Sequence, residues 1–379
     1  MTASITLLDR LIGFPTVSHQ SNMDMIDFMR DTLAASGIAS QIIKDDTGLK
    51  ANLYATVGPQ DLPGVMLSGH TDVVPVAGQA WNRDPFKMSE ADNLLYGRGT
   101  TDMKGFIACA LSAAIRASDM DLKTPLHLAF SYDEEIGCVG VRRLIDVLEN
   151  APVRPKFCLI GEPTLMQVAT AHKGKVASRA ICRGVECHSA MAPTGVNAIH
   201  LAADLMGEIR KIQTEIEKSG ARDGDYDVPY TTLHAGIIRG GEALNIVPNL
   251  CTLDFEIRNL AADDPEALMD QIVAHARRIA ESYQGAAIEF EDIHRYPGLD
   301  TPPDSDVVSF VKSLTGANST TKLSFGTEGG LFDQKLGVPT VVCGPGSMAQ
   351  GHKPDEFIAT SEMANCDRML DALLDRLTD

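Results

Sequence analysis

The chain has 379 residues, of which 51 are acidic and 33 basic, so its formal net charge at pH 7 is −18. The length predicts two domains or three, since a domain takes about 150 residues. An apolar fraction of 44% and a charged fraction of 22% are typical of globular proteins and exclude disorder as the main state. The acidic balance argues against nucleic-acid binding and against a polybasic membrane-surface role.

The sequence predicts neither a membrane span nor a secretory signal. No stretch of roughly 20 apolar residues is present, and Asp9 and Arg10 lie where the apolar core of a signal peptide would be. The 8 cysteines include no C-x-x-C pair, and most lie in apolar runs such as those around Cys158 and Cys343. This usage favours buried free thiols in a reducing cytoplasm.

The first part of the chain alternates helix and strand signals. Apolar residues recur at helical spacing after Ser21, a candidate cap, and Gly37 can end that helix. Strands are predicted at 51–57, 64–69, 126–132 and 157–160, with helices at 103–117 and 138–149. The pattern resumes near the C-terminus with a helix at 305–315, a strand at 322–325, a helix at 328–336, a strand at 339–343 and a helix at 361–377. Continuous apolar strands alternating with helices predict an α/β domain with a mainly parallel sheet covered on both faces.

The middle of the chain follows a different order. Strands are predicted at 175–183, 231–239, 250–258 and 286–293, with helices at 197–218 and 265–283. This β-α-β-β-α-β order is typical of an α+β ferredoxin-like unit. The stretch 296–303 is predicted to be a linker back to the first domain. We therefore expect a discontinuous domain, 1–173 and 294–379, into which a smaller domain, 174–293, is inserted.

Imidazole and carboxylate groups follow the predicted strands of the larger domain. In open α/β sheets, ligands bind at the carboxyl ends of strands, so groups that follow different strands meet at one edge. Each group alone has an ordinary alternative: Asp102 could cap a helix, and His352 could be a surface residue. Together they predict a site for zinc, cobalt or manganese. The candidate ligands are His70, Asp102, Glu135, Glu162 and His352.

Two further acids adjoin these candidate ligands. Asp72 follows His70 by two residues and could accept the second N–H of that imidazole. Glu134 precedes Glu135, and neighbouring acids can divide the work, one binding metal and one moving protons.

The motifs SGHTDVVP, GRGTTDMKG, SYDEEIG, GEPT and GHKPDE resemble the M20 family of dinuclear metallo-aminoacylases and peptidases. The resemblance covers essentially the whole chain and implies a zinc-peptidase-like catalytic domain with an inserted lid. It implies two divalent metal ions, zinc or alternatively cobalt. Asp102 would bridge them, His70 and Glu162 would complete one site, and Glu135 and His352 the other. Glu134 would be the general acid/base, and Asp72 would orient His70.

The resemblance also implies roles for residues of the lid. The segment beginning at His188 has the form H-S-x-x-x-P, in which the family's histidine reaches the active site of a partner subunit. A homodimer through the lid is therefore expected. Arg258 and Asn245 are implied to bind substrate, with Gly326 and Thr327 as nearby contacts. For Arg258, an ordinary cross-strand ion pair is the alternative, although its planar fork also suits a substrate carboxylate.

Within the family, AHKGK, VPYTT, FGTEGGLF and VVCGPGS are most similar to the acetylornithine deacetylase subgroup. The implied activity is removal of the acetyl group from N²-acetyl-L-ornithine, a small-molecule N-acyl amino acid, in arginine biosynthesis. Thr101 and Gly351 depart from the subgroup's pattern and leave the acyl-amino-acid open. The alternatives are succinyl-diaminopimelate desuccinylase, acetylcitrulline deacetylase, a broad aminoacylase, a dipeptidase and a catalytically silent scaffold.

Overall fold

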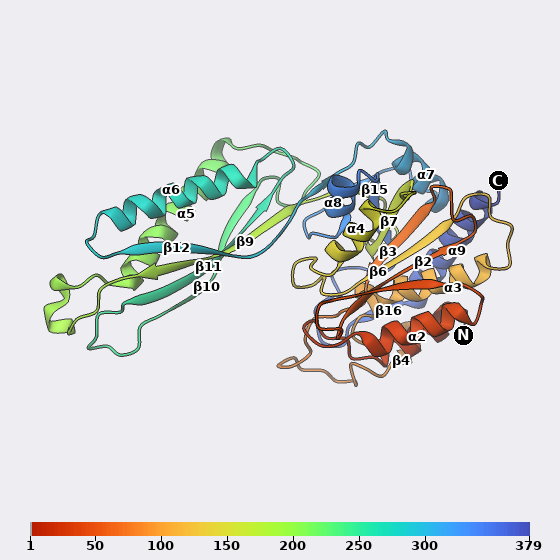
Figure 1. The fold of residues 1–379 in the computed structure, drawn as a ribbon, viewed down its shortest axis with the longest axis horizontal. Coiled ribbons are helices and arrows are strands. Elements are labelled where there is room, and N and C mark those ends of the chain that lie inside the picture. The colour runs from red at the N-terminus through yellow and green to blue at the C-terminus, as the bar shows by residue number, and fades with distance from the viewer. Residues whose placement is uncertain (1) are drawn as a thin grey trace. The chain divides into compact units, whose positions relative to one another are not determined.

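A computed structural model describes residues 2–379, which form two compact units (Figure 1). The first unit runs to Ala171 and also contains Leu299–Lys322 and Thr327–Asp379. The second unit contains His172–Gly298 and Leu323–Gly326. The expected division lay at 173/174 and 293/294, whereas the units divide at 171/172 and 298/299 and the second one gains the short segment Leu323–Gly326.

The first unit is built on a nine-stranded sheet with the order β1-β2-β6-β3-β7-β15-β8-β13, and β14 pairs with β8. The central strands β6, β3, β7 and β15 are parallel neighbours, while β1, β2 and β8 join in antiparallel pairs. This arrangement confirms the predicted α/β class with a mostly parallel central sheet. The strands are β1 Ser40–Lys44, β2 Ala51–Val57, β3 Val65–His70, β6 Leu126–Ser131, β7 Phe157–Pro163, β8 Ala169–His172, β13 Leu299–Asp300, β14 Thr321–Leu323 and β15 Thr340–Gly344.

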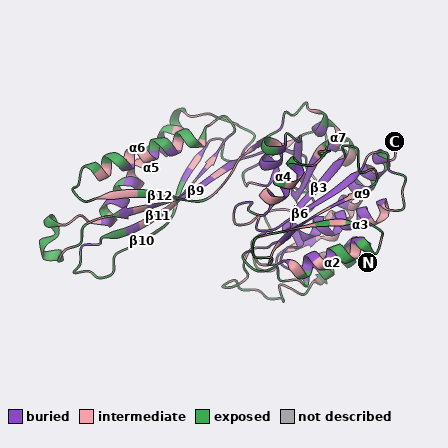
Figure 2. Ribbon diagram, in the orientation of Figure 1, coloured by how far each residue is buried: buried purple, intermediate pink, exposed green. Residues whose placement is uncertain are grey.

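Helices bury the central strands of this sheet. Figure 2 shows β3 and β6 buried along their lengths, as expected for strands whose residues are apolar on both faces. Helix α3 is almost wholly buried and packs against α1 and α9. A small sheet, β16-β5-β4, joins Phe357–Ala359, Leu94–Tyr96 and Ser89–Ala91. The helices are α1 Ala3–Ile12, α2 Met23–Ala34, α3 Gly105–Ala117, α4 Val141–Glu149, α7 Asp306–Thr315, α8 Gly329–Leu331 and α9 Thr360–Leu377.

The second unit has the predicted β-α-β-β-α-β order. Its antiparallel sheet has the order β10-β11-β9-β12, and helices α5 and α6 lie against one face (Figure 1). Residues of β11 alternate between the two faces of the sheet. The side buried against the helices carries Cys251, Leu253, Phe255 and Ile257, and the opposite side carries Thr252, Asp254, Glu256 and Arg258. The elements are β9 Gly174–Arg183, α5 Ala198–Ser219, β10 Thr232–Gly240, β11 Leu250–Asn259, α6 Pro265–Glu281 and β12 Ala287–Tyr296.

Several local features differ from the sequence-based expectations. Helix α1 was not expected, and helix α2 begins after Asn22 rather than after Ser21. The side chain of Asn22 bonds to the backbone of Ala51 instead of capping the helix, so tertiary contact overrides the local capping signal. The predicted linker contains the short strand β13. Among residues 2–379, no helix combines the length and the apolar character that a membrane span requires.

Candidate metal centre

The carboxyl ends of four neighbouring strands of the first unit carry the candidate ligands. His70 is the last residue of β3, and Glu162 lies near the end of β7. Glu135 follows β6, and His352 lies in the loop that follows β15. Asp102 comes from the turn before α3, and its peptide bond to Met103 is cis. Because β6, β3, β7 and β15 are adjacent and parallel, their carboxyl ends meet at one edge of the sheet.

These side chains form two overlapping groups that share Asp102. His70, Asp102 and Glu162 form one group, and Asp102, Glu135 and His352 form the other; within each, one ligand atom per residue lies within 4.8 Å of the others. Asp102 Oδ1 is 3.0 Å from His70 Nε2, and its Oδ2 is 3.1 Å from His352 Nε2. One carboxylate therefore offers an oxygen to each group, which is the geometry that a residue bridging two ions requires.

The orientation of His70 is set by the backbone. Its Nδ1 is 2.9 Å from the carbonyl oxygen of Asp72, whereas the nearer carboxylate oxygen of Asp72 is 3.5 Å away. Nδ1 therefore carries a hydrogen and donates it to the carbonyl, which directs Nε2 at Asp102 and Glu162.

The electrostatics of the cluster fit cations. Burial raises the pKa of Glu135 to about 7, and repulsion from Asp102 adds to this shift. Burial likewise raises the pKa of Glu162 well above its usual value. Hydrogen bonds to Asp102 and Glu135 raise the pKa of His352 to about 10. The buried carboxylates thus need positive charge, which protons on the imidazoles or bound divalent cations can supply. Two imidazoles and three carboxylates suit zinc or cobalt, so the donor set fits two such ions.

Asp72 holds the loop that carries the acidic pair. Its Oδ1 accepts the backbone N–H of Glu134 at 3.0 Å, and its Oδ2 accepts that of Glu135 at 3.3 Å. The hydroxyl of Ser18 also donates to Oδ2, at 2.7 Å. The carboxylate of Asp72 therefore orients the 134–135 loop, while its carbonyl orients His70.

Glu134 is not a member of either ligand group. Burial raises the pKa of its carboxyl well above the usual value, and repulsion from Glu135 and Glu328 adds to the shift. Cys138 Sγ donates a weak hydrogen bond to its Oε1 at 3.5 Å. A partly buried carboxyl beside the ligands, and not one of them, has the position and the proton affinity that a general acid/base needs.

Sequence reasoning missed several residues that support the site. Asp133 has a positive φ of 53°, forms a buried ion pair with Lys50 and accepts the backbone N–H of His19. Glu328 is 2% exposed and accepts a hydrogen bond from Ser131, and burial raises its pKa to about 7. Asp133 could be found from the acidic run that follows β6, but no sequence signal links Lys50 or Glu328 to the site.

Arg258 lies in a polar network on the sheet of the second unit. Its Nε donates to Glu256 at 3.1 Å, and its Nη1 donates to the hydroxyl of Tyr296 at 3.0 Å. Lys175 is the cross-strand neighbour of both Arg258 and Tyr296 and pairs with Glu256 at 3.2 Å. The ion pair is formed with Glu256 on the same strand, whereas the alternative expected a cross-strand pair, and it orients the guanidinium.

His188 and Asn245 lie together at the other end of the same sheet. The backbone of Ser189 donates to the carbonyl of Asn245 at 3.0 Å, and His188 bridges to Ile246. His188 is exposed and its Nδ1 accepts the N–H of Ala190. Leu250 and Arg258 are eight positions apart on β11, so these two parts of the strand are about 26 Å apart. His188 and Arg258 of one chain therefore cannot contact the same small molecule.

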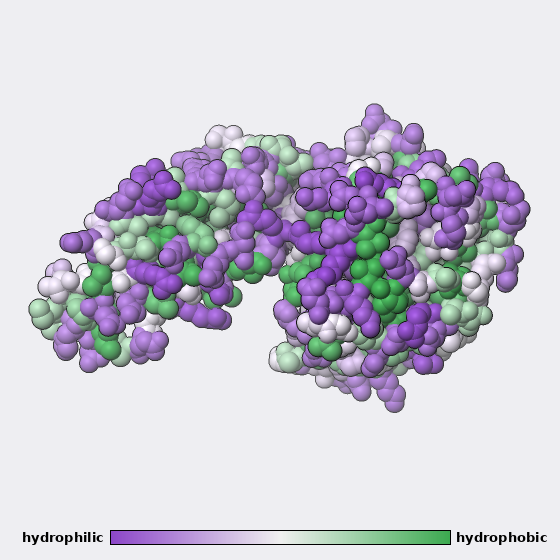
Figure 3. All heavy atoms as spheres, viewed as in Figure 1, coloured by the Kyte–Doolittle hydropathy of each residue, from purple (hydrophilic) through white to green (hydrophobic). Residues whose placement is uncertain are grey.

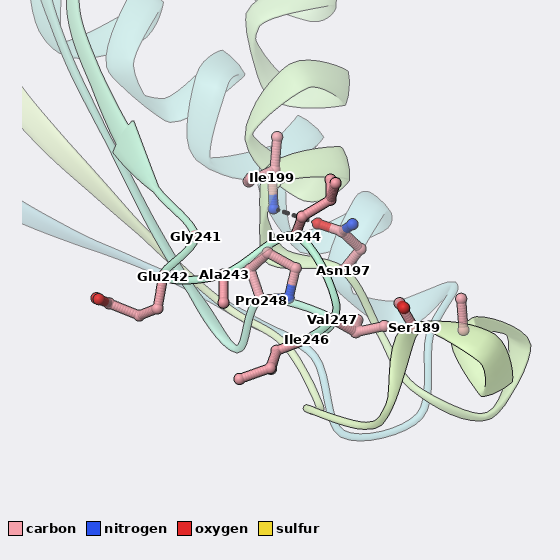
Figure 4. Close-up of a pocket in the computed structure, with 11 residues that line it drawn as sticks. Ser189, Asn197, Ile199, Gly241, Glu242, Ala243, Leu244, Ile246, Val247 and Pro248 are labelled. Atoms are coloured by element: carbon pink, nitrogen blue, oxygen red, sulfur yellow. Dashed lines mark hydrogen bonds between the residues drawn. The ribbon is translucent and has the colours of Figure 1, made fainter.

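A surface pocket of about 470 Å³ lies beside His188 and Asn245 (Figure 4). Ser189, Asn197, Leu244 and Ile246 line it, among others. The side chain of Leu244 is fully exposed, Met191 is 59% exposed and Ile246 is 46% exposed. Figure 3 shows patches of hydrophobic residues among the hydrophilic residues that cover much of this face of the chain.

Gly326 and Thr327 have packing contacts in the structure. A side chain at Gly326 would collide with the ring of Tyr296, since an added Cβ would lie 2.1 Å from Cε2. Thr327 is fully buried, and its hydroxyl accepts the N–H of Gly329.

Comparisons with known proteins show which family the chain belongs to. The model of peptidase family M20/M25/M40 matches residues 66–376. An acetylornithine deacetylase of Klebsiella pneumoniae (strain 342) is 36% identical over 366 residues, which cover 94% of this chain and 93% of the relative. One from Shigella sonnei (strain Ss046) is 35% identical over 364 residues, with the same coverage.

A solved structure shares the whole fold. The M20 family metallo-carboxypeptidase Sso-CP2 of Sulfolobus solfataricus has a TM-score of 0.81 at 19% identity, with 100% of each chain covered. The chain therefore belongs to peptidase family M20/M25/M40 and is a metal-dependent amidohydrolase.

Proposed function

We propose that this protein removes the acetyl group from N²-acetyl-L-ornithine, giving L-ornithine and acetate, as a step of arginine biosynthesis. The observation that carries the proposal is the pair of ligand groups sharing Asp102, with the partly buried carboxyl of Glu134 beside them. The substrate comes from the two relatives named acetylornithine deacetylase, each about one-third identical to this chain.

The metal-binding roles follow the two groups. His70 and Glu162 would hold one ion, Glu135 and His352 the other, and Asp102 both. The ions, zinc or alternatively cobalt, would polarise the scissile carbonyl and lower the pKa of a water molecule. Since the imidazoles must be neutral to bind metal, loading releases the protons that the carboxylates now favour on His70 and His352.

Glu134 would carry the proton through the reaction. Its carboxylate would take a proton from the attacking water and deliver it to the nitrogen of the departing amine. Asp72 would keep Glu134 in place through the backbone N–H that it accepts. Burial would suit Glu134 to both steps, because it favours the protonated carboxyl that must form between them.

The substrate's α-carboxylate would bind Arg258. The guanidinium is oriented by Glu256 and Tyr296, and its planar fork matches two carboxylate oxygens. Gly326 would contribute to this binding because its lack of a side chain leaves room for the Tyr296 ring. Thr327 would contribute by stabilising the turn before α8.

A homodimer formed by the second unit would complete the site. His188 and Asn245 lie beyond the Leu250 end of β11, and that end is about 26 Å from Arg258, so they would act on the substrate bound by the partner chain. There His188 would hydrogen-bond to the developing oxyanion. The exposed apolar side chains of Met191, Leu244 and Ile246 support burial against a second copy. Free cysteines throughout residues 2–379, all but Cys187 buried, support a cytoplasmic location.

The test is an amine-release assay on metal-stripped protein with zinc or cobalt restored. The substrates are N²-acetylornithine, succinyl-diaminopimelate, acetylcitrulline, acetylmethionine and a dipeptide. Metal-dependent release from acetylornithine far above the others is expected. Preference for another N-acyl amino acid would overturn the substrate and leave the mechanism. Full metal loading with no release from any of them would support the silent scaffold and overturn the proposal.

A further inference from the structure

Two oppositely charged side chains are fully buried next to the ligand cluster without belonging to it. Arg98 and Glu356 are each 1% exposed, and Nη1 of Arg98 is 2.6 Å from Oε2 of Glu356. A buried ion pair contributes little net stability compared with apolar residues of similar size, because removing two charges from water is costly. Stability alone is therefore a weak explanation for the pair, and its other contacts indicate what it does.

Glu356 binds the backbone of the turn that carries Asp102. Its Oε1 accepts the N–H groups of Thr101 at 2.9 Å and of Asp102 at 3.1 Å. Its Oε2 accepts the N–H of Gly99 at 3.0 Å. Hydrogen bonds to an ionised acceptor are about twice as strong as neutral ones. Both carboxylate oxygens thus hold the backbone from which the shared ligand projects.

Arg98 connects the same carboxylate to the loop that carries His352. Its Nη1 donates to the carbonyl of Lys353 at 3.3 Å, and its Nη2 donates to Oε1 of Gln79 at 2.6 Å. The amide of Gln79 in turn donates to the carbonyl of His352 at 2.8 Å. Trp81 donates its indole N–H to Oε1 of Gln79, which leaves the amide nitrogen facing His352.

The backbone of His352 needs such support. Its φ is +62°, a region that side-chain-bearing residues seldom adopt and that surrounding contacts must maintain. Its side chain is 49% exposed, so packing restrains it little. The hydrogen bond from Gln79 to its carbonyl therefore restrains the backbone from which the imidazole reaches Asp102 and Glu135.

We propose that Arg98, Glu356 and Gln79 are positioning residues that hold Asp102 and His352 in the geometry required by the second metal ion. This inference rests on the proposed two-metal function. The three side chains form one continuous path between ligands that are 250 residues apart in the chain. His70 and Glu162 have no hydrogen bond with Gln79, so the two ions should respond differently to its loss.

The decisive variant is Gln79→Ala, because Gln79 is only partly buried and its loss should not prevent folding. Gln60→Ala is the matched control: the Gln60 amide also donates to backbone carbonyls, those of Thr56 and Gly58, but to no ligand. Metal-stripped proteins are titrated with Co²⁺ and followed by visible absorption and calorimetry. Wild type and Gln60→Ala should bind two ions with the same affinities. Gln79→Ala should bind the first normally and the second about 10–100-fold more weakly.

Glu356→Gln tests the other arm of the path. Glutamine keeps the size of the side chain but places an NH₂ group against a backbone N–H, so the Asp102 turn loses an acceptor. Because both groups share Asp102, both ions should bind more weakly. Glu362→Gln is the control, because the carboxylate of Glu362 also accepts a backbone N–H, that of Gly346. This variant should bind both ions normally. The melting temperature of each metal-free variant separates this effect from loss of fold.

Two results would overturn the inference. One is a Gln79→Ala protein whose second-ion affinity equals that of Gln60→Ala. The other is equal weakening of both ions in Gln79→Ala together with a lower metal-free melting temperature, which indicates a purely structural role. If wild type binds two ions but does not hydrolyse acetylornithine, the proposed substrate fails and the positioning result still stands. If wild type binds no ions, both fail.

Discussion

Replacement of Asp72 by asparagine tests how the structure orients its acidic pair. The carboxylate accepts three hydrogen bonds, from the N–H groups of Glu134 and Glu135 and from the hydroxyl of Ser18. In Asp72→Asn, the amide oxygen can still accept the N–H of Glu134. The new NH₂ group would then occupy the position of Oδ2, where Ser18 can rotate its hydroxyl to accept but the N–H of Glu135 cannot.

The magnitude follows from that unpaired N–H. A buried donor left without an acceptor costs about 1–3 kcal/mol, and this cost falls on the loop that carries Glu134 and Glu135. A loosened general base and ligand typically lower activity about 10–100-fold. The tautomer of His70 should be unaffected, because its Nδ1 donates to the carbonyl of Asp72, which the substitution keeps.

The assay measures kcat and KM for N²-acetylornithine at a zinc concentration that saturates wild type, with a separate titration of each ion. Asp72→Asn should lose turnover and bind the ion held by His70 nearly normally. Ser18→Ala removes one donor but keeps both backbone N–H groups of the loop on the carboxylate, so it should lose less turnover than Asp72→Asn. Turnover within twofold of wild type would refute the reasoning. Full recovery with excess zinc would mean that Asp72 acts through metal affinity instead.

Four further outcomes are expected. Glu134→Gln should keep both ions and lose about 10²–10⁴-fold in kcat, while Glu135→Gln should lose the second ion; substantial turnover in Glu134→Gln would rule out its acid/base role. Arg258→Ala should raise KM about 10–100-fold with little change in kcat, because charged hydrogen bonds contribute about 1.5–3 kcal/mol, and Arg295→Ala, on β12 of the same sheet, should leave KM unchanged. His188→Ala and Glu134→Ala should each be inactive alone and regain part of the activity when mixed as dimers, so failure to recover would argue against a shared site. Burial lowers the pKa of His127 to about 4, so the unfolded chain takes up this proton before the folded chain does as the pH falls below 6.5. The free energy of unfolding should therefore drop by about 3 kcal/mol between pH 6.5 and 4. Denaturant unfolding of metal-free His127→Gln should lack this part of the drop.

Most of the fold could be predicted from the sequence, because its strands and helices follow their hydrophobic periodicities. The strand at 51–57 and the order of elements in the second unit are examples. Helix α1 was not predicted, and α2 was predicted to follow Ser21, whereas it follows Asn22. The side chain of Asn22 accepts a hydrogen bond from the backbone N–H of Ala51 instead of capping the helix. Such tertiary hydrogen bonds leave no local pattern.

The sequence alone determined which residues are candidates for chemistry, because imidazoles and carboxylates that follow parallel strands must meet at one edge of the sheet. Only the tertiary structure decided how they are held. The backbone contact of His70, the two N–H groups on Asp72, and the path from Glu356 through Arg98 and Gln79 to His352 join residues far apart in the chain. Their physical cause is the burial of polar groups, each of which needs a partner wherever the fold supplies one, and the chain's order does not encode that choice.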